Sequence, residues 1–122
     1  MLNRFVRMRS LNRKNRYNRK GLKTGYWEDY WDDINLECKG YYKNGLEEGY
    51  WEYYDGDKLS SKGSYKNGLT NGKWEWYYNN SNLSSSGFYT EGIRVGIWEW
   101  YSKDGLLDSR GLYEGGDFIK LL

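Results

Sequence analysis

Hydrophobic and polar residues alternate along most of this chain, in short runs that glycine and polar residues interrupt. The most regular run is KGSYKNGLTNGKWEWYY, residues 62–78. A period of two indicates β-strands with two different faces. We therefore expect one strand around Lys73 to Tyr78 and another from Leu59 to Tyr65. The segment KNGLTNG between them is expected to reverse the chain, because asparagine and glycine tolerate the positive φ of hairpin turns.

The same phrase recurs at a nearly constant interval. Equivalent segments begin at Lys39 and at Ser86, and a shorter copy begins at Arg19. The tryptophan that marks each copy recurs after 24, 23 and 24 residues, at Trp27, Trp51, Trp74 and Trp98. A fixed period of this length is typical of repeat proteins, in which stacked neighbours stabilise one another. The sequence therefore predicts a series of β-hairpins.

Period two also assigns the faces of the predicted sheet. Trp51 and Tyr53 share one face, and Glu52 and Tyr54 share the other. The glycine of each second strand is expected on the tryptophan face, where its missing side chain lets a neighbouring indole lie flat on the backbone. These glycines are Gly40, Gly63, Gly87 and Gly111.

Composition fits a thin sheet better than a two-layer domain. Aromatic residues are 20% of the chain, against 38% for all hydrophobic residues, so aliphatic side chains are too few for a compact core. Sixteen glycines and no proline suit paired strands joined by tight turns. We expect a basic arm with a degenerate half-repeat over residues 1–20 and four hairpin repeats over residues 21–122. Phe118, Ile119, Leu121 and Leu122 would cap the last hairpin.

The pattern G-x-Y-x-x-G-x-x-x-G-x-W-E-x-Y, as in Gly63–Tyr78, resembles the MORN repeat (membrane occupation and recognition nexus). It is most similar to the MORN-repeat-variant class, whose members are often labelled antitoxin-component-like. The resemblance covers about Gly21 to Gly116. It implies an all-β fold: an elongated, open-ended, single antiparallel sheet of consecutive hairpin repeats. It also implies a scaffolding or interaction role, of which an antitoxin-like role is one form, rather than catalysis.

Catalytic and metal-binding patterns are not evident. Glu28, Glu52, Glu75 and Glu99 recur identically, which favours pairing with lysines such as Lys62 or Lys66 across the sheet over catalysis, since a catalytic pair needs two different environments. The chain has no histidine and a single cysteine, Cys38, so a zinc site is not expected. DGDK at residues 55–58 lacks the ligand spacing of a calcium loop. We predict a protein that is not an enzyme and needs no cofactor.

More aromatic residues are present than one sheet layer can bury. Rigid tyrosine and tryptophan side chains are common at binding surfaces. We predict a protein partner on an aromatic sheet face, expected to be the tyrosine face, or at an end of the sheet, although a tyrosine face that is merely solvated remains the alternative. The candidate partner-binding residues are Tyr30, Tyr54, Trp76, Tyr77, Trp100 and Tyr101.

The net charge of +2 hides a strong asymmetry. Residues 24–122 contain ten basic and all 17 acidic residues, which gives them a net charge of −7. The basic arm is either a solvated tail, a contact for anionic lipid, or a contact for an acidic partner or nucleic acid. Nucleic acid ranks lower, because the acidic sheet would repel phosphate. The arm's basic residues before Lys23 are Arg4, Arg7, Arg9, Arg13, Lys14, Arg16, Arg19 and Lys20.

Localisation is predicted from what the chain lacks. One cysteine cannot form an intrachain disulfide, and no apolar run is long enough for a signal peptide or a membrane span. The expected compartment is therefore the cytoplasm, with an arginine-rich mitochondrial transit peptide as the alternative. Self-association through open sheet edges is a further expectation.

Overall fold

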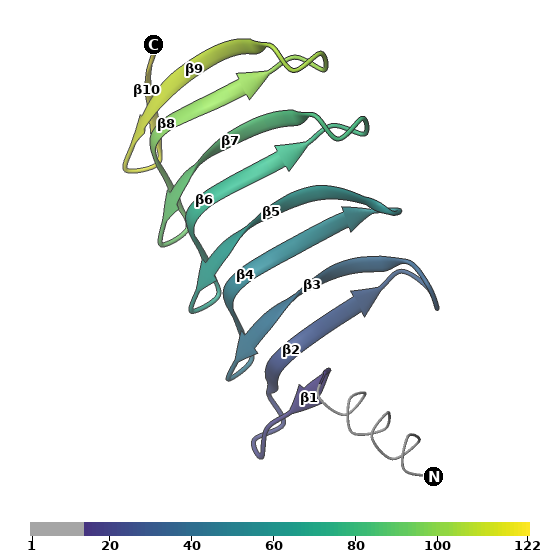
Figure 1. Ribbon diagram of the computed structural model, residues 1–122. Coiled ribbons are helices and arrows are strands. Elements are labelled where there is room, and N and C mark those ends of the chain that lie inside the picture. Colours follow the sequence, from purple (N-terminus) through teal and green to yellow (C-terminus); the bar gives the residue numbers. More distant parts are fainter. Residues whose placement is uncertain (1–13) are drawn as a thin grey trace.

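The computed structural model describes residues 14–122, which form one antiparallel sheet of ten strands without a helix (Figure 1). The strands lie side by side in the order in which they occur in the chain. This confirms the predicted all-β, single-sheet architecture. The strands are β1 Arg16–Tyr17, β2 Lys23–Tyr30, β3 Leu36–Lys43, β4 Leu46–Asp55, β5 Lys58–Lys66, β6 Leu69–Tyr77, β7 Leu83–Thr90, β8 Ile93–Tyr101, β9 Leu107–Glu114 and β10 Asp117–Leu121.

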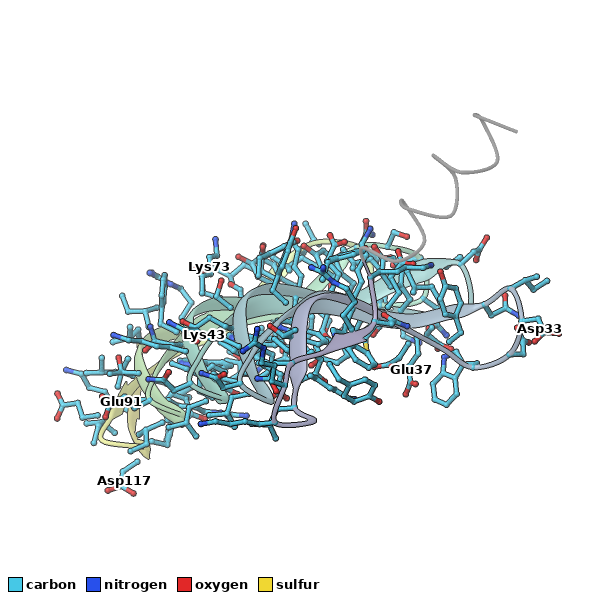
Figure 2. The ribbon with its side chains drawn as sticks, turned by 90° about the horizontal axis from the view of Figure 1, so that it is seen from below. Asp33, Glu37, Lys43, Lys73, Glu91 and Asp117 are labelled. Carbon is cyan, nitrogen blue, oxygen red and sulfur yellow. The ribbon has the colours of Figure 1, made fainter. Side chains whose placement is uncertain are left out.

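The turns alternate between the two long edges of the sheet (Figure 1). Figure 2 shows Asp33, in one of the polar turns, at one end of the strands. Glu91 and Asp117, at the turns equivalent to Asn44-Gly45 and Asn67-Gly68, lie at the other end. The latter turns are shorter than expected. Asn67 and Gly68 have φ of 52° and 81°, as a type I′ turn requires, and β6 begins directly afterwards. The next glycine, Gly72 (φ 94°), lies within β6, where the pairing with β5 shifts register.

Edge-to-face aromatic contacts hold the repeats together. Trp51 and Trp98 are 1% exposed, and the other two repeat tryptophans are also buried. Tyrosines alternate with these indoles at centroid separations of 5.0–6.5 Å, so that the rings form one continuous row across the sheet. The row is Tyr17, Trp27, Tyr42, Trp51, Tyr65, Trp74, Tyr89, Trp98, Tyr113 and Phe118.

Glycine provides the surface on which each indole lies. A Cβ built on Gly63 would be 2.1 Å from Cδ2 of Trp74, and Gly40 and Gly87 are covered in the same way by Trp51 and Trp98. The expected indole seat is therefore confirmed at three of the four glycines.

The fourth seat differs from the prediction. Gly111 is covered mainly by the Phe118 ring, 2.5 Å from an ideal Cβ, with Trp100 at 3.3 Å. The reason is that no tryptophan follows Gly111 in the sequence, so the ring is supplied by β10. Phe118 thus covers the last hairpin, although half of its own surface is exposed.

Candidate binding surfaces

The sheet has two chemically distinct faces. The tryptophan face carries the buried indoles, with Tyr53, Trp76 and Trp100 two residues further along their strands. The tyrosine–glutamate face carries the repeated glutamates and the tyrosines that alternate with them, as in β4. Each candidate residue can therefore be assigned to one face or the other.

An ion-pair ladder crosses the tyrosine–glutamate face. Each repeated glutamate has a basic partner, on a neighbouring strand for three of them and at Lys14, just before β1, for Glu28. This confirms the expected pairing for Lys62, whose Nζ lies 3.9 Å from Glu75. Lys66 instead lies opposite Leu69, at the end of its hairpin. The remaining pairs are Lys14–Glu28 at 2.6 Å, Lys39–Glu52 at 3.4 Å and Arg110–Glu99 at 3.1 Å.

Tyrosine hydroxyls complete the environment of these carboxylates. Tyr50 and Tyr54 donate hydrogen bonds of 2.9 and 2.7 Å to the two oxygens of Glu52. Burial opposes ionisation of Glu52, but these bonds and nearby Lys39 hold its pKa below the ordinary value. Burial, followed by the bond to Glu52, raises the pKa of Tyr50. The glutamates are thus structural anions that organise this face.

The six candidate partner-binding residues lie on opposite faces. Tyr30, Tyr54 and Tyr101 donate hydrogen bonds to the glutamate two residues before them in the same strand. Tyr77 lies beside Lys62, whose Nζ is 5.9 Å from the ring centre. A rigid partner on this face would not reach the other two candidates, Trp76 and Trp100, which lie on the tryptophan face.

The tryptophan face carries a second aromatic column beside the buried row. Tyr53, Trp76 and Trp100 occupy equivalent positions on β4, β6 and β8 and are all half-buried. Trp76 stacks on Trp98 at 5.4 Å with an interplanar angle of 30°. On the strand between Tyr53 and Trp76 the residue paired with both is the small Ser61. We call this column, Tyr53, Trp76 and Trp100, the aromatic terrace.

A cavity of about 310 Å³ lies on the terrace between Trp76 and Trp100. Ser85, which pairs with both tryptophans, lines it together with Ser84, Arg94 and Trp98. The sequence reasoning missed Arg94 as part of this surface. The only available signal was that arginine stands where the two preceding repeats have Glu47 and Thr70.

Arg94 is held in place by aromatic rings. Its guanidinium carbon lies 4.5 Å from the Trp98 ring centre and 5.3 Å from that of Tyr113, and Nη1 donates a 3.1 Å hydrogen bond to the Tyr113 hydroxyl. Burial lowers its pKa, but the bonds to tyrosine hydroxyls outweigh it and leave the pKa raised. The cavity therefore has a fixed positive charge at one side.

Cys38 lies on the tryptophan face, where it pairs with Asp29 and Tyr53. It is buried, and its Sγ lies 3.6 Å from Oδ2 of Asp29. Burial, and then the charge of Asp29, raise the pKa of the thiol to about 12, so it stays protonated near neutral pH. Among residues 14–122, no group of three or more acidic, cysteine or histidine side chains is placed to hold a metal ion.

Four of the eight basic residues named above for the arm lie within the described part of the chain. Arg4, Arg7, Arg9 and Arg13 lie outside it. Lys14 pairs with Glu28, and Arg16 belongs to β1, which pairs with β2, so these two residues extend the sheet. The last two, Arg19 and Lys20, are exposed in the turn before β2. The same described residues contain no helix able to span a membrane.

Comparison with protein-family models and with curated proteins gives no match for this chain. The MORN resemblance therefore stays a prediction from the repeat pattern.

Proposed function

We propose that this protein is a non-enzymatic scaffold that binds another protein through an aromatic face of its sheet. The observation that supports it best is the aromatic terrace, where large rings are packed against the sheet and remain partly exposed. Rigid aromatic rings bind well because they lose little conformational entropy on contact. The tryptophan face is preferred over the tyrosine–glutamate face, where three of the four candidate tyrosine hydroxyls are already bonded to glutamate.

The test compares the two faces in the same protein. Affinity purification from the native host is done with wild type, with Trp76→Ala/Trp100→Ala, and with Tyr54→Ala/Tyr77→Ala/Tyr101→Ala, and binding of any recovered protein is then measured with purified components. Loss of binding in the tryptophan variant alone supports the terrace. Loss in the tyrosine variant alone assigns the partner to the other face. Equal binding by all three folded proteins would refute the proposal.

Binding of anionic lipid through the basic arm is the competing hypothesis. It is weakened at Lys14, which is engaged with Glu28, and it rests on the remaining basic residues of the arm. Liposome flotation with phosphatidylserine vesicles, using the full chain and a chain that lacks residues 1–13, tests it. Equal flotation of both, or of neither, would exclude a role for those residues.

A further inference from the structure

We propose that the partner segment bound by the aromatic terrace is a polyproline II helix, with an apolar residue, typically proline, at every third position. This inference rests on the proposed protein-binding function and specifies its ligand. Two independent features support it: the spacing of the terrace rings and the hydrogen-bonding groups around the cavity.

The spacing follows from the sheet. Tyr53, Trp76 and Trp100 lie on alternate strands, each pair separated by one intervening strand. Neighbouring strands are about 4.7–4.9 Å apart, so equivalent positions two strands apart are separated by roughly 9.4–9.8 Å. A polyproline II helix has three residues per turn and rises about 3.1 Å per residue, so it repeats every ~9.3 Å. In a polyproline segment that crosses the strands, every third residue would therefore lie over a terrace ring.

The slot between Trp76 and Trp100 suits such a ligand. Ser85 lies between these two terrace rings, and its short side chain leaves room there for a proline ring. Between Tyr53 and Trp76, in contrast, the Trp74 ring packs against both, at centroid distances of 6.3 and 6.1 Å. The cavity over Ser85 measures about 310 Å³, which is near the lower end of the range for ligand pockets. Proline-rich segments bind elsewhere in grooves lined by aromatic rings, because their extended helix is preformed and costs little entropy to order.

Hydrogen bonding favours the same ligand. The four buried indoles donate their N–H groups to backbone carbonyls, for example Trp74 to Ser64 and Trp98 to Phe88. Within residues 14–122 no such bond is formed by Trp76 or Trp100, and neither N–H is buried without a partner.

The cavity therefore offers donors. Its lining includes Trp76 and Trp100, whose N–H groups have no partner among the described residues, two serines and Arg94, and no carboxylate or amide side chain. The Trp98 N–H is already bonded to the Phe88 carbonyl, and serine hydroxyls can accept as well as donate. Each proline has a carbonyl acceptor but no N–H donor, and the carbonyls of a polyproline II helix are free. A polysaccharide, the other ligand that flat aromatic rings bind, carries a hydroxyl donor on most ring carbons, and among the lining side chains only the two serine hydroxyls can accept hydrogen bonds from it. The lining thus matches a proline-rich segment better.

The experiment uses the full-length ¹⁵N-labelled protein and decaproline as the probe. Ten residues of polyproline II extend about 31 Å, which spans the two intervals of the terrace. The seven tryptophans give seven indole N–H signals, which single substitutions assign. We expect decaproline to shift the signals of Trp76 and Trp100 and to leave those of Trp27 and the exposed Trp31 unchanged. A flexible ten-residue glycine–serine peptide should cause no shift.

Variants locate the binding surface. Trp76→Ala and Trp100→Ala should each weaken decaproline binding at least tenfold, whereas Tyr54→Ala/Tyr77→Ala on the opposite face should leave it unchanged. Because Trp76 also stacks on Trp98, its loss can disturb folding. Trp100→Phe, which keeps a ring and removes the N–H donor, therefore serves as a second variant and should weaken binding at least threefold.

Three results would overturn the inference: no shift at millimolar decaproline, equal shifts with the glycine–serine peptide, or binding of a β-1,4-linked glucose hexamer instead. If decaproline fails while a host protein still binds in a Trp76- and Trp100-dependent manner, the protein-binding function stands and only the polyproline ligand is refuted. If decaproline and every host protein fail, both are refuted.

Discussion

Replacement of Gly63 by alanine tests whether the glycine seats hold the repeats together. Gly63 lies in the middle of β5 and its φ is not positive, so alanine can adopt its backbone conformation. Such a replacement would ordinarily stabilise the protein by about 0.4–1 kcal/mol, because alanine restricts the unfolded chain. Here the new Cβ would be 2.1 Å from Cδ2 of Trp74, which is far shorter than a van der Waals contact. The indole therefore has to move away from residue 63.

The cost is the set of interactions that the displaced indole loses. The hydrogen bond from Nε1 of Trp74 to the Ser64 carbonyl contributes about 1 kcal/mol. The edge-to-face contacts with Tyr65 and Tyr89 contribute about 0.5–1.5 kcal/mol each. Trp74 is 4% exposed in the native protein, and its displacement would also expose part of its buried surface to water. After subtraction of the alanine benefit, we expect a net loss of about 2–4 kcal/mol in unfolding free energy.

Urea denaturation followed by circular dichroism measures this loss, with Ser64→Ala as the matched control. Ser64 is the next residue of the same strand and projects to the opposite face, so its replacement should change stability by about 0.5 kcal/mol or less. In a Trp74→Ala background, Gly63→Ala should become neutral or stabilising, because the space is empty. An unchanged or increased stability of Gly63→Ala in the wild-type background would refute the reasoning.

Four further predictions concern other parts of the sheet. Ser86 pairs with both Glu75 and Glu99, at the position where the preceding repeats have Lys39 and Lys62. Ser86→Lys should therefore raise the free energy of unfolding by up to about 1 kcal/mol at low salt, and by less in 0.5 M NaCl. A lower melting temperature of this variant at low salt would contradict the ion-pair ladder. Cys38, whose thiol pKa is raised to about 12, should react with Ellman's reagent at pH 8 far more slowly in the native protein than in 6 M urea, and rapid native labelling would show that it is accessible. Because this folded-state pKa exceeds the unfolded value, the thiol's contribution to stability should be complete below pH 8 and decline between about pH 9 and 12, measurably less so in Cys38→Ser. Gly111→Ala should cost about 1 kcal/mol or less, clearly below Gly63→Ala, because the ring it meets is half-exposed and can move; equal losses would contradict this.

The repeat pattern was sufficient to predict the fold because each local signal was present several times. Alternation placed Trp51 and Glu52 on opposite faces, and the glycine opposite each indole indicated the seat. Where the repeat is broken, prediction failed for a physical reason. No tryptophan follows Gly111, and although Phe118 was expected to cap the last hairpin, the pattern could not show that its ring would replace the indole on Gly111.

The candidate site was predicted less completely than the fold. Trp76 and Trp100 were identified because they exceed what one layer can bury, and both remain partly exposed. The tyrosine hydroxyl bonds to glutamate were not foreseen, since a period of two shows that two residues share a face but not that they touch. Arg94 was missed because its contacts with Trp98 and Tyr113 depend on side-chain conformation.

The positions that vary between repeats are the informative ones for function. The buried indoles recur because every unit requires them for stacking, so they cannot distinguish one end of the sheet from the other. The terrace position, in contrast, changes from Asp29 through Tyr53 to Trp76 and Trp100 along the sheet. The aromatic rings of the terrace, and with them the cavity lined by Arg94, therefore lie in the central and C-terminal repeats. A ligand that uses the terrace should bind across β4 to β8 and should not require the first hairpin.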